Sequence, residues 1–303
     1  MITLRGKKIC MPRPCVLAVG KFECIHLGHR ALIAEMVRVA EEAGLASALV
    51  MFDPHPYQVL ADFGYKPLFT SREREYLAGE LGAVDYLLEY PFDRDFAAIS
   101  PEGFCRMLFE DLQARAVVVG AGYRFGHKRV GTVETLRQMA AAYGAEIHVV
   151  EPHGYADGGV KTSTSTVREL LHANQLAEAE SLLGYPFFVM GEAVPGEGEA
   201  MPGGQVGRNA GPLALSLQPP AEKFLPADGV YATRTTIYPA GNELLSLREN
   251  RDVRCYYSVA KVSRPAGENK DAPRLVETHL LDYNGGEVYG RHVRVEFLRV
   301  GPQ

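Results

Sequence analysis

Val16-Leu-Ala-Val-Gly-Lys-Phe-Glu-Cys-Ile-His-Leu-Gly-His29 is the stretch of sequence that decides the fold. Its first four residues form a short apolar run, which is typical of a buried strand. Gly20 ends that strand, and segment 31–40 after the second histidine has the apolar spacing of a helix. The stretch therefore predicts a parallel strand that turns directly into a helix.

Two histidines, His26 and His29, lie at this turn. A helix N-terminus offers free N–H groups and the positive end of the helix dipole, which favour phosphate. The spacing places both imidazoles on one face, and Gly28 leaves room for a phosphate to approach. An ordinary helix cap is an alternative. Zinc is another, but the helical metalloprotease pattern needs Glu where Leu27 stands, so we expect no metal-binding residues.

The amino-acid composition is that of a globular protein with no general attraction for polyanions. Of 303 residues, 47% are hydrophobic and 23% charged, and the net charge is −5. This disfavours a nucleic-acid partner. No apolar run approaches the ~18 residues of a membrane span. Five scattered cysteines without a Cys-x-x-Cys pair indicate a reducing compartment. We therefore expect a cytoplasmic protein with small-molecule substrates and no membrane partner, while the oligomeric state stays open.

The second segment predicted to bind a ligand is Phe52-Asp-Pro-His-Pro56, which begins at the last residue of the apolar run 45–52. Its two prolines predict a rigid loop rather than a further strand or helix. Loops at the carboxyl ends of parallel strands are where such sheets bind ligands. Asp53 and His55 are thus candidate ligand contacts, although both residue types also occur as ordinary turn formers.

Two later segments within the alternating pattern of strands and helices are further candidates for ligand contacts. Gly122–Gly131 is rich in glycine, aromatic and basic residues, which favours a nucleotide or flavin contact over a plain solvated loop. Lys161-Thr-Ser-Thr-Ser-Thr-Val-Arg168 places hydroxyls at a helix start and an arginine one turn in. That arrangement suits phosphate oxygens, but hydroxyl runs are also common as plain helix caps.

The alternation predicts a doubly wound parallel α/β domain over residues 1–183. Gly184-Tyr-Pro186 interrupts it, and residues 184–303 predict a small all-β barrel. Among its strands we expect 276–281 and 293–298 to be joined as a hairpin, since Asp282-Tyr-Asn-Gly285 contains a strong Asn-Gly turn signal.

Four motifs in the right order carry a family resemblance: Gly20–His29, Phe52–Pro56, Gly120–Gly126 and Ser163–Arg168. With them the chain resembles the prokaryotic bifunctional riboflavin kinase/FAD synthetase family over nearly its whole length. The resemblance implies adenylyl transfer from ATP to FMN, with Mg²⁺, giving FAD and pyrophosphate.

Site residues follow from the resemblance. It implies catalytic roles for His26, His29 and Arg168. It implies ATP contacts from Gly20, Phe22, Gly28, Thr164, Ser165 and Arg168. It implies flavin contacts from Phe52, Asp53, His55, Tyr123, Arg124 and Phe125.

Several positions depart from the family pattern. Glu23 and Cys24 replace an Asp-Gly pair, and Gly122 replaces a polar residue thought to help hold the flavin. In the kinase half, Gly211-Pro-Leu-Ala-Leu-Ser216 stands for Gly-Phe-Pro-Thr-Ala-Asn, so Ala and Ser replace the phosphate-placing Thr and Asn. Glu277 matches the family's catalytic base. We therefore expect an FAD synthetase with a degenerate kinase domain. A fully bifunctional enzyme and a non-catalytic flavin or nucleotide binder are the alternatives.

Overall fold

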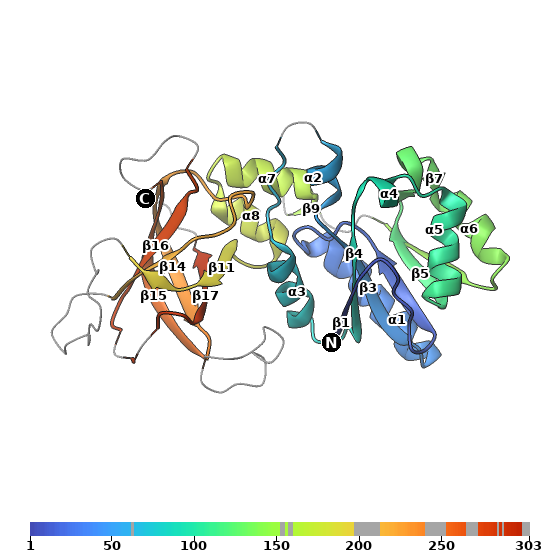
Figure 1. Ribbon diagram of the computed structural model, residues 1–303, viewed down its shortest axis with the longest axis horizontal. Helices are drawn as coiled ribbons and strands as arrows, with labels where there is room; N and C mark the ends of the chain where they lie inside the picture. The colour runs from blue at the N-terminus through green and yellow to red at the C-terminus, as the bar shows by residue number, and fades with distance from the viewer. Residues whose placement is uncertain are drawn as a thin grey trace. The chain divides into compact units, whose positions relative to one another are not determined.

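The computed structural model describes residues 1–61, 64–151, 155–156, 160–196, 213–239, 253–264, 272–283, 285–286 and 288–298. Its residues group into two compact units (Figure 1). The first contains Met1–Pro67 and Arg74–Thr164, and the second contains Leu68–Glu73 and Ser165–Gln303. This grouping reflects spatial contact, and the predicted domain boundary between residues 183 and 184 stays a prediction.

The first unit is built on a six-stranded sheet in the order β1-β4-β3-β2-β5-β8, with every pair parallel. The predicted first strand, β2, lies inside this sheet, and all of its residues are buried. Such all-round burial explains why its sequence is continuously apolar rather than alternating. The strands are β1 (Ile2–Arg5), β2 (Cys15–Val19), β3 (Ala46–Asp53), β4 (Tyr86–Pro91), β5 (Ala114–Gly120) and β8 (Glu146–Val150).

Helices connect these strands as the alternating pattern predicts. Helix α1 (Leu27–Ala43) packs against β2, β3 and β5, and ends at Gly44 in a left-handed conformation. The other helices are α2 (Pro56–Leu60), α3 (Ser71–Glu80), α4 (Arg94–Ala97), α5 (Pro101–Arg106), a π-helical turn (Met107–Asp111), a 3-10 turn (His127–Arg129), α6 (Val133–Ala141), α7 (Thr164–His172) and α8 (Leu176–Leu183). Among the helices that the structure describes, none is long and apolar enough to cross a bilayer.

The sheet order brings three predicted motifs to one edge. Strand β2 pairs with β3 on one side and with β5 on the other, so the chain changes direction across the sheet at β2. Ligands bind open parallel sheets outside the carboxyl ends of the strands at such a switch point. Three predicted motifs follow the carboxyl ends of β2, β3 and β5, so the topology gathers them.

The second unit contains a seven-stranded antiparallel sheet in the order β11-β17-β14-β15-β16-β13-β12. Strands β11 and β12, at the two ends of this order, are separated by one residue of chain. The ends of the sheet therefore meet, which nearly closes it into the predicted barrel. The strands are β11 (Phe188–Glu192), β12 (Val194–Pro195), β13 (Leu213–Leu217), β14 (Gly229–Ile237), β15 (Arg254–Ser263), β16 (Leu275–Leu280) and β17 (His292–Phe297).

The predicted hairpin in the barrel is wrong. Strand β16 pairs with β13 and β15, whereas β17 pairs with β11 and β14, so the two strands are not neighbours. Long-range pairing overrides the local turn signal, because closing the barrel requires β17 to pair with β11. Asn284, the residue behind that signal, lies outside the described residues.

Three further differences concern individual elements. The segment expected to be a loop after Phe52 instead starts a short helix, α2, at Pro56. Proline suits the first position of a helix, where its missing N–H costs nothing. Strands β1 and β15 were not expected from the sequence. In addition, two short ribbons occur: β6 (Arg124–Phe125) with β7 (Gly131–Thr132), and β9 (Tyr155–Ala156) with β10 (Val160–Lys161).

Segment Leu68–Glu73 joins the second unit through a buried ion pair. Glu73 Oε2 lies 3.1 Å from Lys223 Nζ, and both side chains are almost fully buried. The same carboxylate forms a capping box with Thr70 and accepts the main-chain N–H of Met190 at 2.8 Å. Lys223 also lies over the Phe69 ring, 4.6 Å from its centre.

Candidate active site

The loop between β2 and α1 is tightly packed and contains two buried residues with an uncommon backbone conformation. Phe22 and Ile25 both have positive φ angles, 42° and 37°, and both side chains are fully buried. A Cβ at Gly20 would lie 2.9 Å from the Phe22 ring, so any larger residue there would have to displace that buried ring. Gly20 and Phe22, predicted as ATP contacts, therefore hold the shape of the loop that precedes His26.

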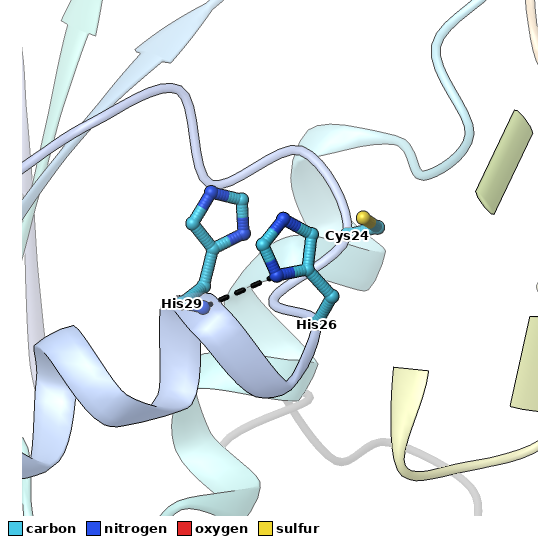
Figure 2. Close-up of side chains that lie close together, drawn as sticks. All are labelled: Cys24, His26 and His29. Atoms are coloured by element: carbon cyan, nitrogen blue, oxygen red, sulfur yellow. Dashed lines mark hydrogen bonds between the residues drawn. The ribbon is translucent and has the colours of Figure 1, made fainter. Parts of the chain in front are cut away.

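The two predicted catalytic histidines lie together at the start of α1 (Figure 2). His26 is the N-cap, and its Nδ1 accepts the main-chain N–H of His29 at 3.2 Å. The rings stack with centroids 3.8 Å apart and planes inclined by 11°. Gly28 lies between them in the first turn of the helix. The predicted placement of both imidazoles on one face of this turn is thus present in the structure.

Burial keeps both imidazoles neutral. It lowers the pKa of His26 to about 4 and lowers the pKa of His29 well below its ordinary value. Since Nδ1 of a neutral His26 accepts a hydrogen bond, its proton is on Nε2, which can donate to a ligand. Nδ1 of His29 is buried and has no hydrogen-bond partner within the described part of the chain. The pair therefore offers neutral donors and lone pairs to a ligand rather than two positive charges.

Cys24 lies beside this pair and contacts the last predicted motif. Its buried Sγ is 3.7 Å from the hydroxyl of Thr164, the first residue of α7. Ser165 and Arg168 follow on α7 and belong to the second unit. There the guanidinium carbon of Arg168 lies 5.7 Å from the centre of the Phe224 ring. The predicted phosphate contacts of Ser165 and Arg168 stay predictions.

At the end of β3, the predicted contact Asp53 pairs with a buried arginine. Arg74 donates to Asp53 Oδ1 at 3.1 Å and to the carbonyl of Phe52 at 2.9 Å. Burial raises the pKa of the Asp53 carboxyl, although Arg74 opposes this rise. Arg74 was not identified from the sequence, because it lies within an ordinary charged helix, 21 residues away from its partner.

His55 joins a polar cluster with two residues that the sequence did not place in the site. Its Nε2 lies 3.5 Å from Oε2 of Glu23, which also accepts the Tyr65 hydroxyl at 2.5 Å. The ring of His55 stacks on Tyr65 at 5.1 Å. Glu23 and His55 are both buried. Glu23, which departs from the family's aspartate, therefore links the first predicted motif to the second.

The predicted flavin contacts differ in exposure. The Phe52 and Phe125 side chains are buried in the core of the first unit, where Phe125 packs on Phe104 at 5.4 Å. Tyr123 is half-buried and stacks on Phe125, while Arg124 is exposed. Gly122 has open space around it. Within this segment, the surface open to a ligand is therefore offered by Gly122, Tyr123 and Arg124.

Glu277, the predicted kinase base, is half-buried on β16 of the barrel. It faces Ser216 of β13 in the strand register. A Cβ at Gly196 would lie 3.1 Å from its Oε1, so the main chain approaches this carboxylate closely. Ala214 and Ser216 are both buried. Gly211 and Pro212, which begin the predicted phosphate motif, lie outside the described residues.

In the part of the chain that the structure describes, the side chains grouped to share a metal ion are Cys24, His26 and His29. Their ligand atoms lie within 4.8 Å of one another. Mg²⁺, the ion that the family resemblance implies, prefers oxygen ligands, whereas these atoms are sulfur and nitrogen. The cluster therefore does not fit Mg²⁺.

Comparison with known proteins covers both units. A model of FAD synthetase matches residues 8–165, and a model of riboflavin kinase matches residues 183–300. A bifunctional riboflavin kinase/FMN adenylyltransferase from Escherichia coli K12 is 33% identical over 286 residues, covering 93% of this chain and 82% of that protein. One of the same name from Bacillus subtilis is 29% identical over 287 residues, covering 94% and 83%.

A solved structure is also similar to most of the chain. The crystal structure of a macrolide-efflux protein from Streptococcus pneumoniae is 25% identical, with a TM-score of 0.77. The match covers 98% of this chain and 90% of that one.

Proposed function

Because this chain belongs to the family of bifunctional riboflavin kinase/FMN adenylyltransferases, we propose that it transfers AMP from ATP to FMN, giving FAD and pyrophosphate. The observation that carries this proposal is the stacked pair His26 and His29 at the N-terminus of α1, beside the switch point of the sheet. Free N–H groups at this helix end and a donor on His26 suit a phosphate group.

The reaction needs no enzyme nucleophile. An oxygen of the FMN phosphate attacks the α-phosphorus of ATP in line, and the bond from that phosphorus to the oxygen bridging to the β-phosphate breaks. Pyrophosphate leaves with the bonding electrons. The work of the protein is to hold the two substrates in line and to stabilise the charge that builds on the phosphoryl oxygens.

The histidine pair stabilises that charge through neutral donors. His26 donates from Nε2, because its Nδ1 already accepts the N–H of His29. A donor held rigidly by the helix start and by ring stacking is aimed before the charge develops, so it loses little energy to reorganisation. Thr164, Ser165 and Arg168 at the start of α7 hold the β- and γ-phosphates as pyrophosphate leaves.

The flavin lies near the ends of β3 and β5 in this proposal. Asp53 and His55 supply polar contacts, and each is held by a buried partner, Arg74 and Glu23 respectively. Tyr123 and Arg124 supply the open surface on the other side of β2. Phe52 and Phe125 support these loops from the core rather than stacking on the flavin.

We further propose that the barrel does not phosphorylate riboflavin. Phosphoryl transfer needs a base near the hydroxyl and a correctly aimed γ-phosphate at the same time. Glu277 supplies a base, but Ala214 has no side-chain oxygen, and Ser216 is shorter than the asparagine that it replaces. The match of residues 183–300 to riboflavin kinase favours the second candidate, a fully bifunctional enzyme.

One assay with two substrates tests both proposals. Purified protein is incubated with ATP and Mg²⁺ and either FMN or riboflavin, and the products are separated by chromatography. We expect FAD and pyrophosphate from FMN, and no FMN from riboflavin. Failure to make FAD from FMN would overturn the first proposal. Multiple-turnover formation of FMN, or of FAD made from it, in the riboflavin reaction that the variant Glu277→Gln abolishes would establish the bifunctional alternative.

A further inference from the structure

Cys24, His26 and His29 bring one thiol and two imidazoles to the same point at the start of α1 (Figure 2). The family pattern that the chain resembles has glycine where Cys24 stands. Local spacing alone did not indicate a metal site, because the metalloprotease pattern is absent. In the structure, the Cys24 thiol lies close to the two imidazoles, although Cys24 is outside the His-x-x-His motif.

Sulfur and imidazole nitrogen are the ligands that Zn²⁺ prefers, and three protein ligands with one open position are a common zinc arrangement. A tetrahedral zinc ion holds its ligand atoms roughly 3.3–3.7 Å apart, given bond lengths of about 2.0–2.3 Å. The three ligand atoms here lie within 4.8 Å of one another. Side-chain rotations that move these atoms by about an ångström would therefore complete the site.

The His29 ring offers a lone pair for a metal, and the His26 ring can offer one by changing its tautomer. The cap holds the proton of a neutral His26 on Nε2, so binding a metal through Nε2 moves that proton to Nδ1 and gives up the cap hydrogen bond from the N–H of His29. Nδ1 of His29 is buried and has no hydrogen-bond partner in the described structure. A buried nitrogen without a partner costs free energy, and a metal ion would satisfy it. The thiolate formed on binding supplies a negative charge, and its proton is released to solvent.

We propose that Cys24, His26 and His29 form a binding site for a thiophilic divalent cation of the zinc class, and that its occupancy inhibits adenylyl transfer. The inhibitory part rests on the proposed function, because the metal takes the two imidazoles assigned there to the phosphate of ATP. Mg²⁺ does not compete, since it prefers oxygen ligands.

Metal binding is measured first, without any activity assay. Metal-free protein is titrated with Zn²⁺ by calorimetry and with Co²⁺ by absorbance, in which a thiolate ligand gives a charge-transfer band. We expect one ion per chain and a thiolate band for the native protein. The variant Cys24→Ser keeps a side chain of similar size beside Thr164, but it should weaken zinc binding by more than ~100-fold, since even losses outside the ligand shell cost about 10–100-fold.

Matched controls separate this site from other thiols and from misfolding. Cys10 and Cys255 are exposed, so the double variant Cys10→Ser/Cys255→Ser removes adventitious surface binding and should keep the cobalt band. Melting temperatures check that the variants fold, and Cys24→Ala serves as a second removal of the thiol. Absence of binding by the native protein, or equal zinc affinity with and without the Cys24 thiol, would overturn the site.

Inhibition is measured second, as FAD formation from ATP and FMN at saturating Mg²⁺ with increasing Zn²⁺. We expect the native protein to be inhibited, activity to return after a chelator, and Cys24→Ser to keep its basal activity and lose zinc sensitivity. Equal inhibition of both proteins would assign the effect to zinc–ATP and overturn the inhibitory role. If zinc binds through Cys24 but no FAD forms even without zinc, the proposed function fails while the metal site stands.

Discussion

The main-chain N–H of His29 donates to Nδ1 of His26 at 3.2 Å, while the two imidazole rings stack 3.8 Å apart. One histidine is thus both the cap of α1 and a neighbour of the other ring. The hydrogen bond fixes the tautomer of a neutral His26 and leaves Nε2 as its free donor. The two side chains therefore act as one unit, and changing either one also affects the other.

The variant His29→Ala removes one ring but keeps the main-chain N–H that donates to Nδ1 of His26. We expect adenylyl transfer to fall by ~10²-fold or more, because a donor aimed at the developing charge is lost. ATP affinity should change much less. His148→Ala, which removes a half-exposed imidazole on β8, is the matched control and should retain native activity. Native FAD formation by His29→Ala would contradict the central role of this pair.

Protonation of His26 predicts acid sensitivity of the first unit. Its pKa is about 4 in the folded protein and about 6.5 when unfolded, so the unfolded chain binds more protons between these values. The contribution of neutral His26 to the free energy of unfolding is fully present above pH 6.5 and is lost as the pH falls toward 4. It amounts to about 3 kcal/mol for a shift of this size.

The variant His26→Asn isolates this effect, because Asn also caps helices well and does not titrate. Urea unfolding followed by circular dichroism at pH 7, 5.5 and 4 should give the native protein the steeper loss of stability. Parallel pH profiles for the two proteins would mean that His26 is protonated to the same extent in the folded and unfolded states.

The variant Arg168→Ala tests the start of α7. If this guanidinium holds the β- and γ-phosphates, nucleotide affinity should fall, and Arg168→Lys should recover only part of it, because lysine cannot bind in a bidentate manner. Calorimetric titration with a non-hydrolysable ATP analogue measures the change. Unchanged affinity in both variants would reduce this segment to a helix cap that packs on Phe224.

Glu73 and Lys223 provide a prediction for stability. Glu73→Gln or Lys223→Met leaves one buried charge without its partner, which costs about 3–5 kcal/mol in comparable buried pairs. The double variant should recover much of this loss, since the remaining charge is also removed. Melting temperatures of the native, single and double variants measure the coupling. Additive effects of the two single changes would contradict a direct interaction.

Local signals in the sequence were sufficient for some elements and not for others. The run from Val16 to His29 specifies a buried strand and a helix start within one stretch, and both are present. The capping box of Thr70 and Glu73 is also local. By contrast, β16 and β17 find partners set by barrel closure, which a turn dipeptide cannot encode. Likewise, the contact of Glu23 with Tyr65 spans 42 residues, and no periodic pattern signals it.

The membership of Leu68–Glu73 in the second unit has a consequence during protein synthesis. Glu73 leaves the ribosome about 150 residues before Lys223, a delay of roughly 7–30 s at 5–20 residues per second. All six strands of the parallel sheet are made before Lys223, so the sheet can form while Phe69 and Glu73 still lack the lysine. The barrel itself waits longer, because β11 pairs with β17 near the chain's end. The nascent chain therefore carries the Phe69 ring and the Glu73 carboxylate before the residues that pack on them, Phe187, Phe188 and Lys223, have been made.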